Sequence, residues 1–136
     1  MIECGMRNFF VAASVNMGFE NLKGRFRNFS LEVIRLVEPL PHDLVGSVLS
    51  RQLVRSATSA AANYRAACRA KSSAHFISKL GDVEEEADES GFWLEMLVDS
   101  GKLKGVDAAP LIREASELTA IAVASINTAR KTGGRI

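Results

Sequence analysis

The residues of this chain best suited to binding a ligand are arginines that recur along one predicted helix, from about Asp43 to Arg69. At about 100° per residue, Arg51, Arg55, Arg65 and Arg69 fall within roughly 80° of one another. They lie opposite an apolar edge. Guanidinium groups match the geometry of phosphate oxygens, so a stripe of this length fits several phosphates of an RNA or DNA backbone. The spacing therefore predicts a nucleic-acid-binding stripe.

A second interpretation is that the arginines pair with carboxylates of the same protein. The formal net charge is only +1, but residues 23–71 carry nine basic and three acidic groups, whereas residues 72–100 carry one basic and eight acidic groups. Dedicated nucleic-acid binders are usually more basic overall. The stripe could instead pair, within one subunit or between subunits, with acidic residues that share a helical face: Asp82, Glu85, Glu86 and Glu89. The sequence leaves both interpretations open.

The same acidic residues raise the question of a carboxylate-bridged metal site in a helical bundle. That chemistry uses a Glu-x-x-His pair on each of two helices. The histidines are His42 and His75, and Ser72, not a glutamate, stands three residues before His75. Neither histidine has a recognisable serine or cysteine partner, and no glycine-rich phosphate loop is present. We therefore expect no metal, no cofactor and no catalytic residues, and hence a protein that is not an enzyme.

Small polar residues form a ladder between the arginine stripe and the apolar edge of the helix. Gln52, Ser56, Ser59 and Asn63 recur at i, i+4, i+7 and i+11. A helix with such residues can lie close to a neighbour, but its amides and hydroxyls must find partners, which favours one register. Trp93, between Phe92 and Leu94, is expected in the core or an interface. The ladder and Trp93 are thus predicted helix-packing or interface residues, and the many small residues of this helix predict self-association.

Apolar residues recur at three- and four-residue steps through most of the chain, which predicts an all-α protein. Helices are expected over about residues 23–37, 43–69, 73–100 and 107–131, with Asp43 and Ser72 or Ser73 as N-caps. Short connections between long amphipathic helices predict an antiparallel, up-down-up-down four-helix bundle. We expect the bundle to span residues 20–131, after an N-terminal extension (1–19) and before a flexible tail (132–136).

Cysteine usage and hydropathy bear on where the protein works. Cys4 and Cys68 have no metal-binding or redox spacing, which favours free thiols in a reducing cytoplasm. No run reaches the ~18 apolar residues of a membrane span. We expect a cytoplasmic protein with no membrane partner.

Three segments together resemble a known family. They are QLVRSATSAAANYRAA, SSAHFISKLGDVEEEADESGFWLEML and LIREASELTAIAVASINTAR. Their order is similar to the four-helix bundle family of the bacterial large-subunit rRNA intervening-sequence protein, over about residues 20–131. The matching positions are Gln52, Leu53, Arg55, Ser56, Ala57, Ser59, Asn63, Phe76, Lys79, Leu80, Glu86, Glu89, Trp93, Leu94, Glu117 and Leu118.

The resemblance implies a cytoplasmic bundle of four antiparallel helices that assembles into a homopentamer. A related branch is the accessory variability determinant of diversity-generating retroelements, which binds nucleic acid and a partner protein through a basic surface. This chain departs from that branch in its near-zero net charge. The resemblance supplies no catalytic residues. The expected function is thus a nucleic-acid-binding adaptor, and the alternative is a protein–protein scaffold that binds no nucleic acid.

Overall fold

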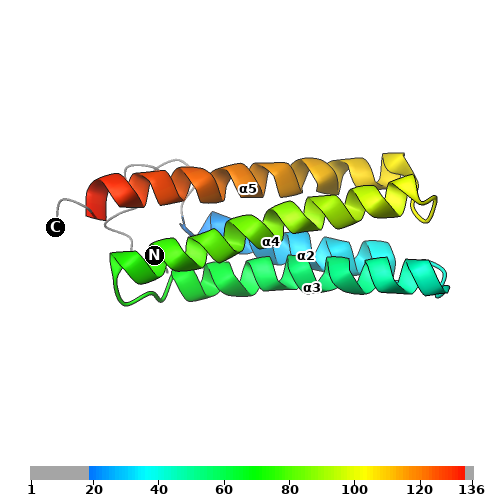
Figure 1. Cartoon of the computed structure of the whole chain (residues 1–136), viewed down its shortest axis with the longest axis horizontal. Helices are drawn as coiled ribbons and strands as arrows, with labels where there is room; N and C mark the ends of the chain where they lie inside the picture. Colours follow the sequence, from blue (N-terminus) through cyan, green and yellow to red (C-terminus); the bar gives the residue numbers. More distant parts are fainter. Residues whose placement is uncertain (1–18, 134–136) are drawn as a thin grey trace.

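The chain folds into long helices, and no strand occurs in the part of it that the structure describes (Figure 1). The structure is a computed structural model that describes residues 19–133. The helices are α2 (Phe19–Val37), α3 (Leu44–Ala67), α4 (Ser73–Asp99) and α5 (Gly105–Gly133). The predicted all-α class is confirmed. Apart from its last residue, where α2 begins, the predicted extension 1–19 lies outside the described residues, as does the end of the predicted tail.

The helices pack side by side as a bundle. α3 contacts both α2 and α4, α4 contacts α5, and α5 returns to α2 in the least extensive of these contacts (Figure 1). Consecutive helices are antiparallel and are joined by the short segments 38–43, 68–72 and 100–104. This is the up-down-up-down arrangement that the sequence predicted. The N-terminal ends of α2 and α4 therefore lie at the same end of the bundle as the C-terminal ends of α3 and α5.

The core contains the apolar seams that periodicity predicted. Leu53 and Ala57 of α3, and Leu80 of α4, are fully buried between the helices. Leu36 of α2 and Val98 of α4 are only partly buried, at the edge of the core. The largest fully buried side chains are Leu22, Phe26, Phe29, Val33, Leu53, Tyr64, Phe76, Leu80, Val83, Leu94, Leu97 and Leu118.

The helix ends follow from local hydrogen bonding. Asp43 caps α3 by accepting from the backbone N–H of Gly46 at 2.7 Å, and Ser72 caps α4 by accepting from His75 N–H at 3.1 Å. α4 ends at Asp99, and Gly101 follows its C-cap with a φ of +79°, which allows the Lys102 N–H to reach the Leu97 carbonyl at 2.9 Å.

Two of the predicted helix starts differ from the structure by more than one residue. α2 begins at Phe19 rather than near Lys23. α5 begins at Gly105 rather than near Asp107, because the N–H groups of Asp107 and Ala108 both bond to the Lys104 carbonyl. Pro110 consequently lies in the second turn of α5. The second helix also ends earlier than predicted, at Ala67.

Candidate functional site

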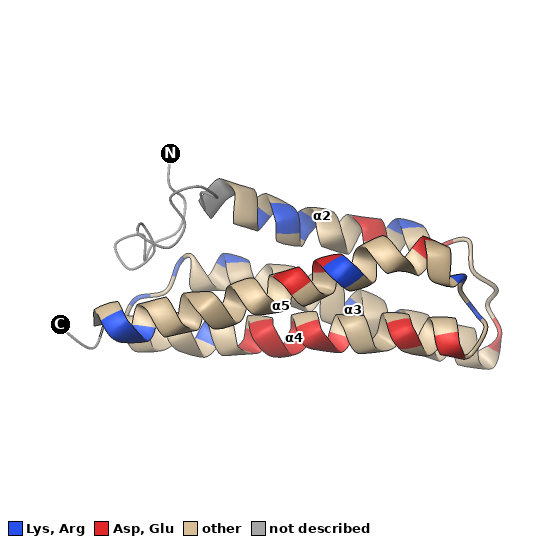
Figure 2. Cartoon of the chain, turned by 90° about the horizontal axis from the view of Figure 1, so that it is seen from above, with Lys and Arg blue, Asp and Glu red and all other residues tan. Residues whose placement is uncertain are grey.

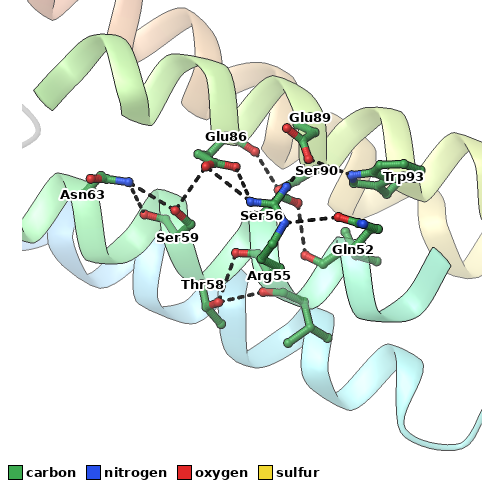
Figure 3. A network of polar contacts seen from close by, with 12 residues as sticks. Gln52, Arg55, Ser56, Thr58, Ser59, Asn63, Glu86, Glu89, Ser90 and Trp93 are labelled. Atoms are coloured by element: carbon green, nitrogen blue, oxygen red, sulfur yellow. Dashed lines mark hydrogen bonds and ion pairs between the residues drawn. The ribbon is translucent and has the colours of Figure 1, made fainter. Parts of the chain in front are cut away.

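The only arginine of the predicted stripe with a carboxylate partner among the described residues is Arg55, on the side of α3 that meets α4. Its Nη1 lies 3.3 Å from Glu86 Oε1, and its Nη2 forms an ion pair with Glu89. Its Nε donates to Gln52 Oε1 at 3.1 Å (Figure 3). For Arg55, the structure therefore supports the second interpretation, in which the arginine pairs with the acidic helix of the same subunit.

The polar ladder faces α4 of the same chain (Figure 3). The hydroxyl oxygens of Ser56 and Ser90 are 2.9 Å apart, and both side chains are fully buried. Ser59 donates to Glu86 Oε2 at 3.2 Å, and the amide of Asn63 donates to the Ser59 carbonyl at 3.0 Å. The structure thus places these residues in the α3–α4 contact of one bundle, which here is called the polar seam (Gln52, Arg55, Ser56, Ser59, Asn63, Glu86, Glu89, Ser90 and Trp93).

Trp93 joins the polar seam from α4. Its indole Nε1 donates to Glu89 Oε1 at 3.0 Å, so the same carboxylate receives both Trp93 and Arg55. The ring is partly buried against the core and meets Phe92 edge-on, with the ring centroids 4.9 Å apart. Phe92 is itself 50% exposed. The indole of Trp93 therefore belongs to the polar seam, whereas the neighbouring Phe92 ring is at the surface.

The other three arginines of the stripe are exposed at opposite ends of α3. Arg51 lies in the N-terminal half of the helix, and Arg65 and Arg69 lie at its C-terminal end. Within residues 21–132, none of the three forms an ion pair with a carboxylate. The structure consequently divides the predicted stripe into a neutralised centre and two uncompensated ends.

Sequence reasoning missed part of the basic surface at the C-terminal end of α3. Arg130 and Lys131 occupy the last turn of α5, which the antiparallel topology brings to this same end of the bundle (Figure 1). The sequence did contain a signal for these two cations, because basic residues are favoured in the last turn of a helix. We call the exposed cations here the basic end: Arg65, Arg69, Lys71, Arg130 and Lys131. Among the described residues, no carboxylate pairs with any of them.

Arg25 is a further cation, on α2, and carboxylates of α5 neutralise it. Its Nη2 lies 2.6 Å from Glu114 Oε1 and 3.0 Å from Glu117 Oε1, and its Nε donates to Glu114 Oε2. The hydrogen bond to Glu114 is the main reason that the pKa of Arg25 is raised. This pair connects α2 to α5 and leaves no charge for a ligand.

Acidic residues recur along α4 (Figure 2), and some of them have ion-pair partners whereas others do not. Glu86 and Glu89 belong to the polar seam, whereas the exposed Glu85, Asp88, Glu95 and Asp99 make no ion pair with any described residue. No three acidic, histidine or cysteine side chains of the described chain converge on a point that could hold a metal ion. None of the described helices combines the length and apolar character that crossing a membrane requires.

The fold and the polar seam define the class of this protein: a small all-helical bundle whose second and third described helices, α3 and α4, are held in register by buried hydroxyls and an arginine fork. The chain belongs to the 23S rRNA-intervening sequence protein family, whose family model matches residues 23–124.

One solved structure supports the same assignment. It is a protein of unknown function from the S23 ribosomal protein family of Bacteroides thetaiotaomicron. The two chains are 29% identical and superpose with a TM-score of 0.74, over 79% of this chain and 96% of that one. No curated protein matches this chain.

Proposed function

We propose that this protein is a non-enzymatic adaptor that binds the phosphate backbone of RNA or DNA through its basic end. The observation that carries the proposal is that Arg65, Arg69 and Lys71 lie at the same end of the bundle as the last turn of α5, with Arg130 and Lys131. All five are exposed and without a carboxylate partner in the described chain. Uncompensated cations on one surface attract phosphates and release counterions when they bind. Arg55 is not among the proposed phosphate-binding residues, because it already pairs with two carboxylates.

We further propose that the protein works in the cytoplasm as a homo-oligomer, with the homopentamer that the family resemblance implies as its expected form. Cys4 and Cys68 have no metal-binding or redox spacing, which supports a reducing compartment. Repetition of the basic end in an assembly strengthens nucleic-acid binding, since several weak phosphate contacts act together. No cofactor is required by this function.

The test is a mobility-shift titration of structured RNA and duplex DNA at several salt concentrations. The variant Arg65→Glu/Arg69→Glu should weaken binding of both ligands and flatten the dependence of log K on log salt by about one unit for each phosphate that the variant no longer binds. The matched control is Arg35→Glu/Arg113→Glu, which makes the same charge change at exposed positions elsewhere. Equal weakening by both variants, or no shift of the wild type at low salt, would contradict the proposal.

A protein–protein scaffold that binds no nucleic acid is the second candidate. The observation that favours it is a set of large apolar side chains at the surface, among them Leu44 (80% exposed), Phe92 (50%) and Val48 (47%). A scaffold would keep its partner when the basic end is reversed. The mobility-shift experiment therefore separates the two candidates.

A further inference from the structure

A groove follows the surface of the bundle between α4 and α5. Its volume is about 530 Å³, and residues 87–95 of α4 and 112–120 of α5 contain all of its lining. The floor consists of small side chains, since a Cβ placed on Gly91 would lie 3.7 Å from the Cβ of Ala115 on the facing helix. This hollow is called the α4–α5 groove. Small residues at its floor allow another element to approach both helices closely.

The α4–α5 groove is apolar, with carboxylates on one side. Phe92 of α4 and Ile112 of α5 border it, and Asp88 and Glu95 contribute to its lining from α4. Both carboxylates are exposed and form no ion pair with any described residue. None of the described residues that line the groove is basic. A complementary occupant therefore supplies apolar contact together with positive charge.

The spacing of the two carboxylates matches the repeat of a helix. Asp88 and Glu95 are seven residues apart on α4, which is two turns, or about 10 Å along the axis. A helix lying alongside α4 presents its own residues i and i+7 on one face at the same spacing. Lys or Arg at those two positions would each meet one carboxylate. Apolar residues at i+3 and i+4 would then enter the groove between them.

The hydrogen-bonding capacity of the groove also favours a helical occupant. Ser116 and Thr119 are the only uncharged polar residues in the described lining, and the Thr119 hydroxyl already donates to the Ala115 carbonyl at 2.7 Å. An extended peptide would place most of its backbone N–H and C=O groups against apolar side chains without partners. A helix satisfies those groups internally.

We propose that the α4–α5 groove binds a basic amphipathic helix of a partner protein. The inference rests on the adaptor role in the proposed function, because an adaptor binds a second partner besides nucleic acid. The partner helix packs along α4 and α5 as an additional helix of the bundle, with its apolar stripe on Gly91 and Ala115. Its cations, seven residues apart, pair with Asp88 and Glu95.

The first test measures the charge preference of the groove with a synthetic peptide. The peptide is an amphipathic helix of leucine, alanine and lysine, with lysines seven residues apart beside a leucine stripe, and its binding is followed by fluorescence anisotropy. Asp88→Lys/Glu95→Lys should weaken binding about tenfold or more, because both ion pairs become like-charge contacts. A second peptide with glutamate in place of each lysine should show the opposite preference.

The matched control for this test is Glu32→Lys/Glu85→Lys. It makes the same charge change at exposed positions that do not line the groove, and it should bind the lysine peptide as the wild type does at physiological salt. Equal weakening by the two double variants would overturn the proposal. A wild type that binds neither peptide would also overturn it.

The second test fills the groove without changing its charge. Ala120→Trp adds a large ring at an exposed position of the lining and should abolish peptide binding while circular dichroism shows wild-type helicity. Ala62→Trp makes the same change at an exposed position on α3 and should bind the peptide normally. Retained binding by Ala120→Trp would contradict the proposal. A change of oligomeric state in this variant, measured by sedimentation velocity, would show that a second copy occupies the groove and would reject a partner helix.

Failure of this inference can be told apart from failure of the nucleic-acid proposal. The groove lies along the C-terminal half of α4, whereas the basic end lies at the N-terminal end of that helix. Ala120→Trp should therefore lose the peptide and keep the RNA mobility shift, and Arg65→Glu/Arg69→Glu should do the reverse. A wild type that binds the peptide but shifts no RNA would retain the groove and reject nucleic-acid binding.

Discussion

At the scale of the residue, Arg55 is the side chain whose environment most changes the interpretation of the sequence. Its guanidinium bridges Glu86 and Glu89, which are one turn apart on α4, while Gln52 on its own helix accepts from Nε. The planar fork of arginine suits such a pair of carboxylates. An arginine held in this way contributes to the α3–α4 contact and has little capacity left for phosphate.

The buried hydroxyl pair predicts sensitivity to added volume. Ser56 and Ser90 are fully buried at 2.9 Å, so Ser90→Val should lower the free energy of unfolding by about 1–3 kcal/mol through overpacking. Ser90→Ala should cost less, about 0.5–1.5 kcal/mol, since Ser56 keeps its bond to the Leu53 carbonyl. Urea denaturation provides the measurement. Ser78→Val, at an exposed site on α4, is the control and should be close to neutral.

The N-cap of α3 predicts a dependence of stability on pH. The hydrogen bond from Lys102, at 2.9 Å, and then that from Gly46 N–H hold the pKa of Asp43 below its usual value of 3.8. A carboxyl with a depressed pKa in the folded state stabilises the protein above its usual pKa, and this contribution is lost as the pH falls through the lower, folded-state pKa.

Asp43→Asn keeps the capping oxygen but removes the charge, which isolates this effect. The variant should have a lower urea midpoint than the wild type at pH 7, and the difference should shrink as the solution is acidified below pH 3.8. Asp88→Asn changes an exposed acid that has no ion-pair partner in the described chain, and serves as the control. A difference for Asp43→Asn that persists unchanged in acid would show that charge is not its cause.

At the scale of the element, the seams of the bundle differ in what holds them. The α3–α4 contact combines buried alanines with hydroxyls and a carboxylate network, whereas α4 approaches α5 through small residues such as Gly91 and Ala115. Close approach of this kind requires small side chains at the point of contact. Polar partners then restrict α3 and α4 to one register.

Two helical glycines are expected to respond in opposite ways to alanine. A Cβ at Gly91 would meet Ala115 Cβ at 3.7 Å, an ordinary contact, so Gly91→Ala should raise the free energy of unfolding by about 0.5–1 kcal/mol through helix propensity. A Cβ at Gly46 would lie 2.8 Å from Asp43 Oδ1 and 3.1 Å from the Pro41 carbonyl. Gly46→Ala should therefore displace the cap and destabilise the protein.

The control for this comparison is Gly81→Ala, where nothing lies within 4 Å of the added Cβ. It reports helix propensity alone in the same urea experiment. If Gly91→Ala has a lower free energy of unfolding than Gly81→Ala, by more than the experimental error, then α4 and α5 lie closer together than the 3.7 Å contact indicates.

At the scale of the whole molecule, opposite charges are separated along the bundle as well as between helices. The basic end holds uncompensated cations, and the outer side of α4 holds uncompensated acids (Figure 2). A net charge of +1 conceals this arrangement. The proposed phosphate binding would use the basic end alone.

Closure of the bundle between its first and last described helices depends on Arg25. Arg25→Met should loosen α2 from α5, because it removes the bidentate contact with Glu114 and the contact with Glu117. The global cost should stay within about 1 kcal/mol, as is usual for partly exposed ion pairs. Amide hydrogen exchange should accelerate in α2 while α4 changes little. Equal acceleration in both helices would indicate global destabilisation instead.

The amino-acid sequence by itself predicted the helices, a cap at Asp43, a cap at Ser72 or Ser73, and the buried seams, because apolar periodicity and capping depend on residues near one another in the chain. The positions in the family pattern, from Gln52 to Leu118, likewise indicated the family that the comparison confirmed. These features need no knowledge of which helices are neighbours.

Only the tertiary structure decided which charges are neutralised. Arg55 and Arg51 are one turn apart on the same face, yet Arg55 meets Glu86 and Glu89 of α4 whereas Arg51 meets no carboxylate of the described chain. Arg25 finds its partners on α5, far away in sequence. The antiparallel topology also placed Arg130 at the same end of the bundle as the C-terminal end of α3. The physical reason is that an ion pair depends on distance in space, which helical periodicity within one segment does not specify.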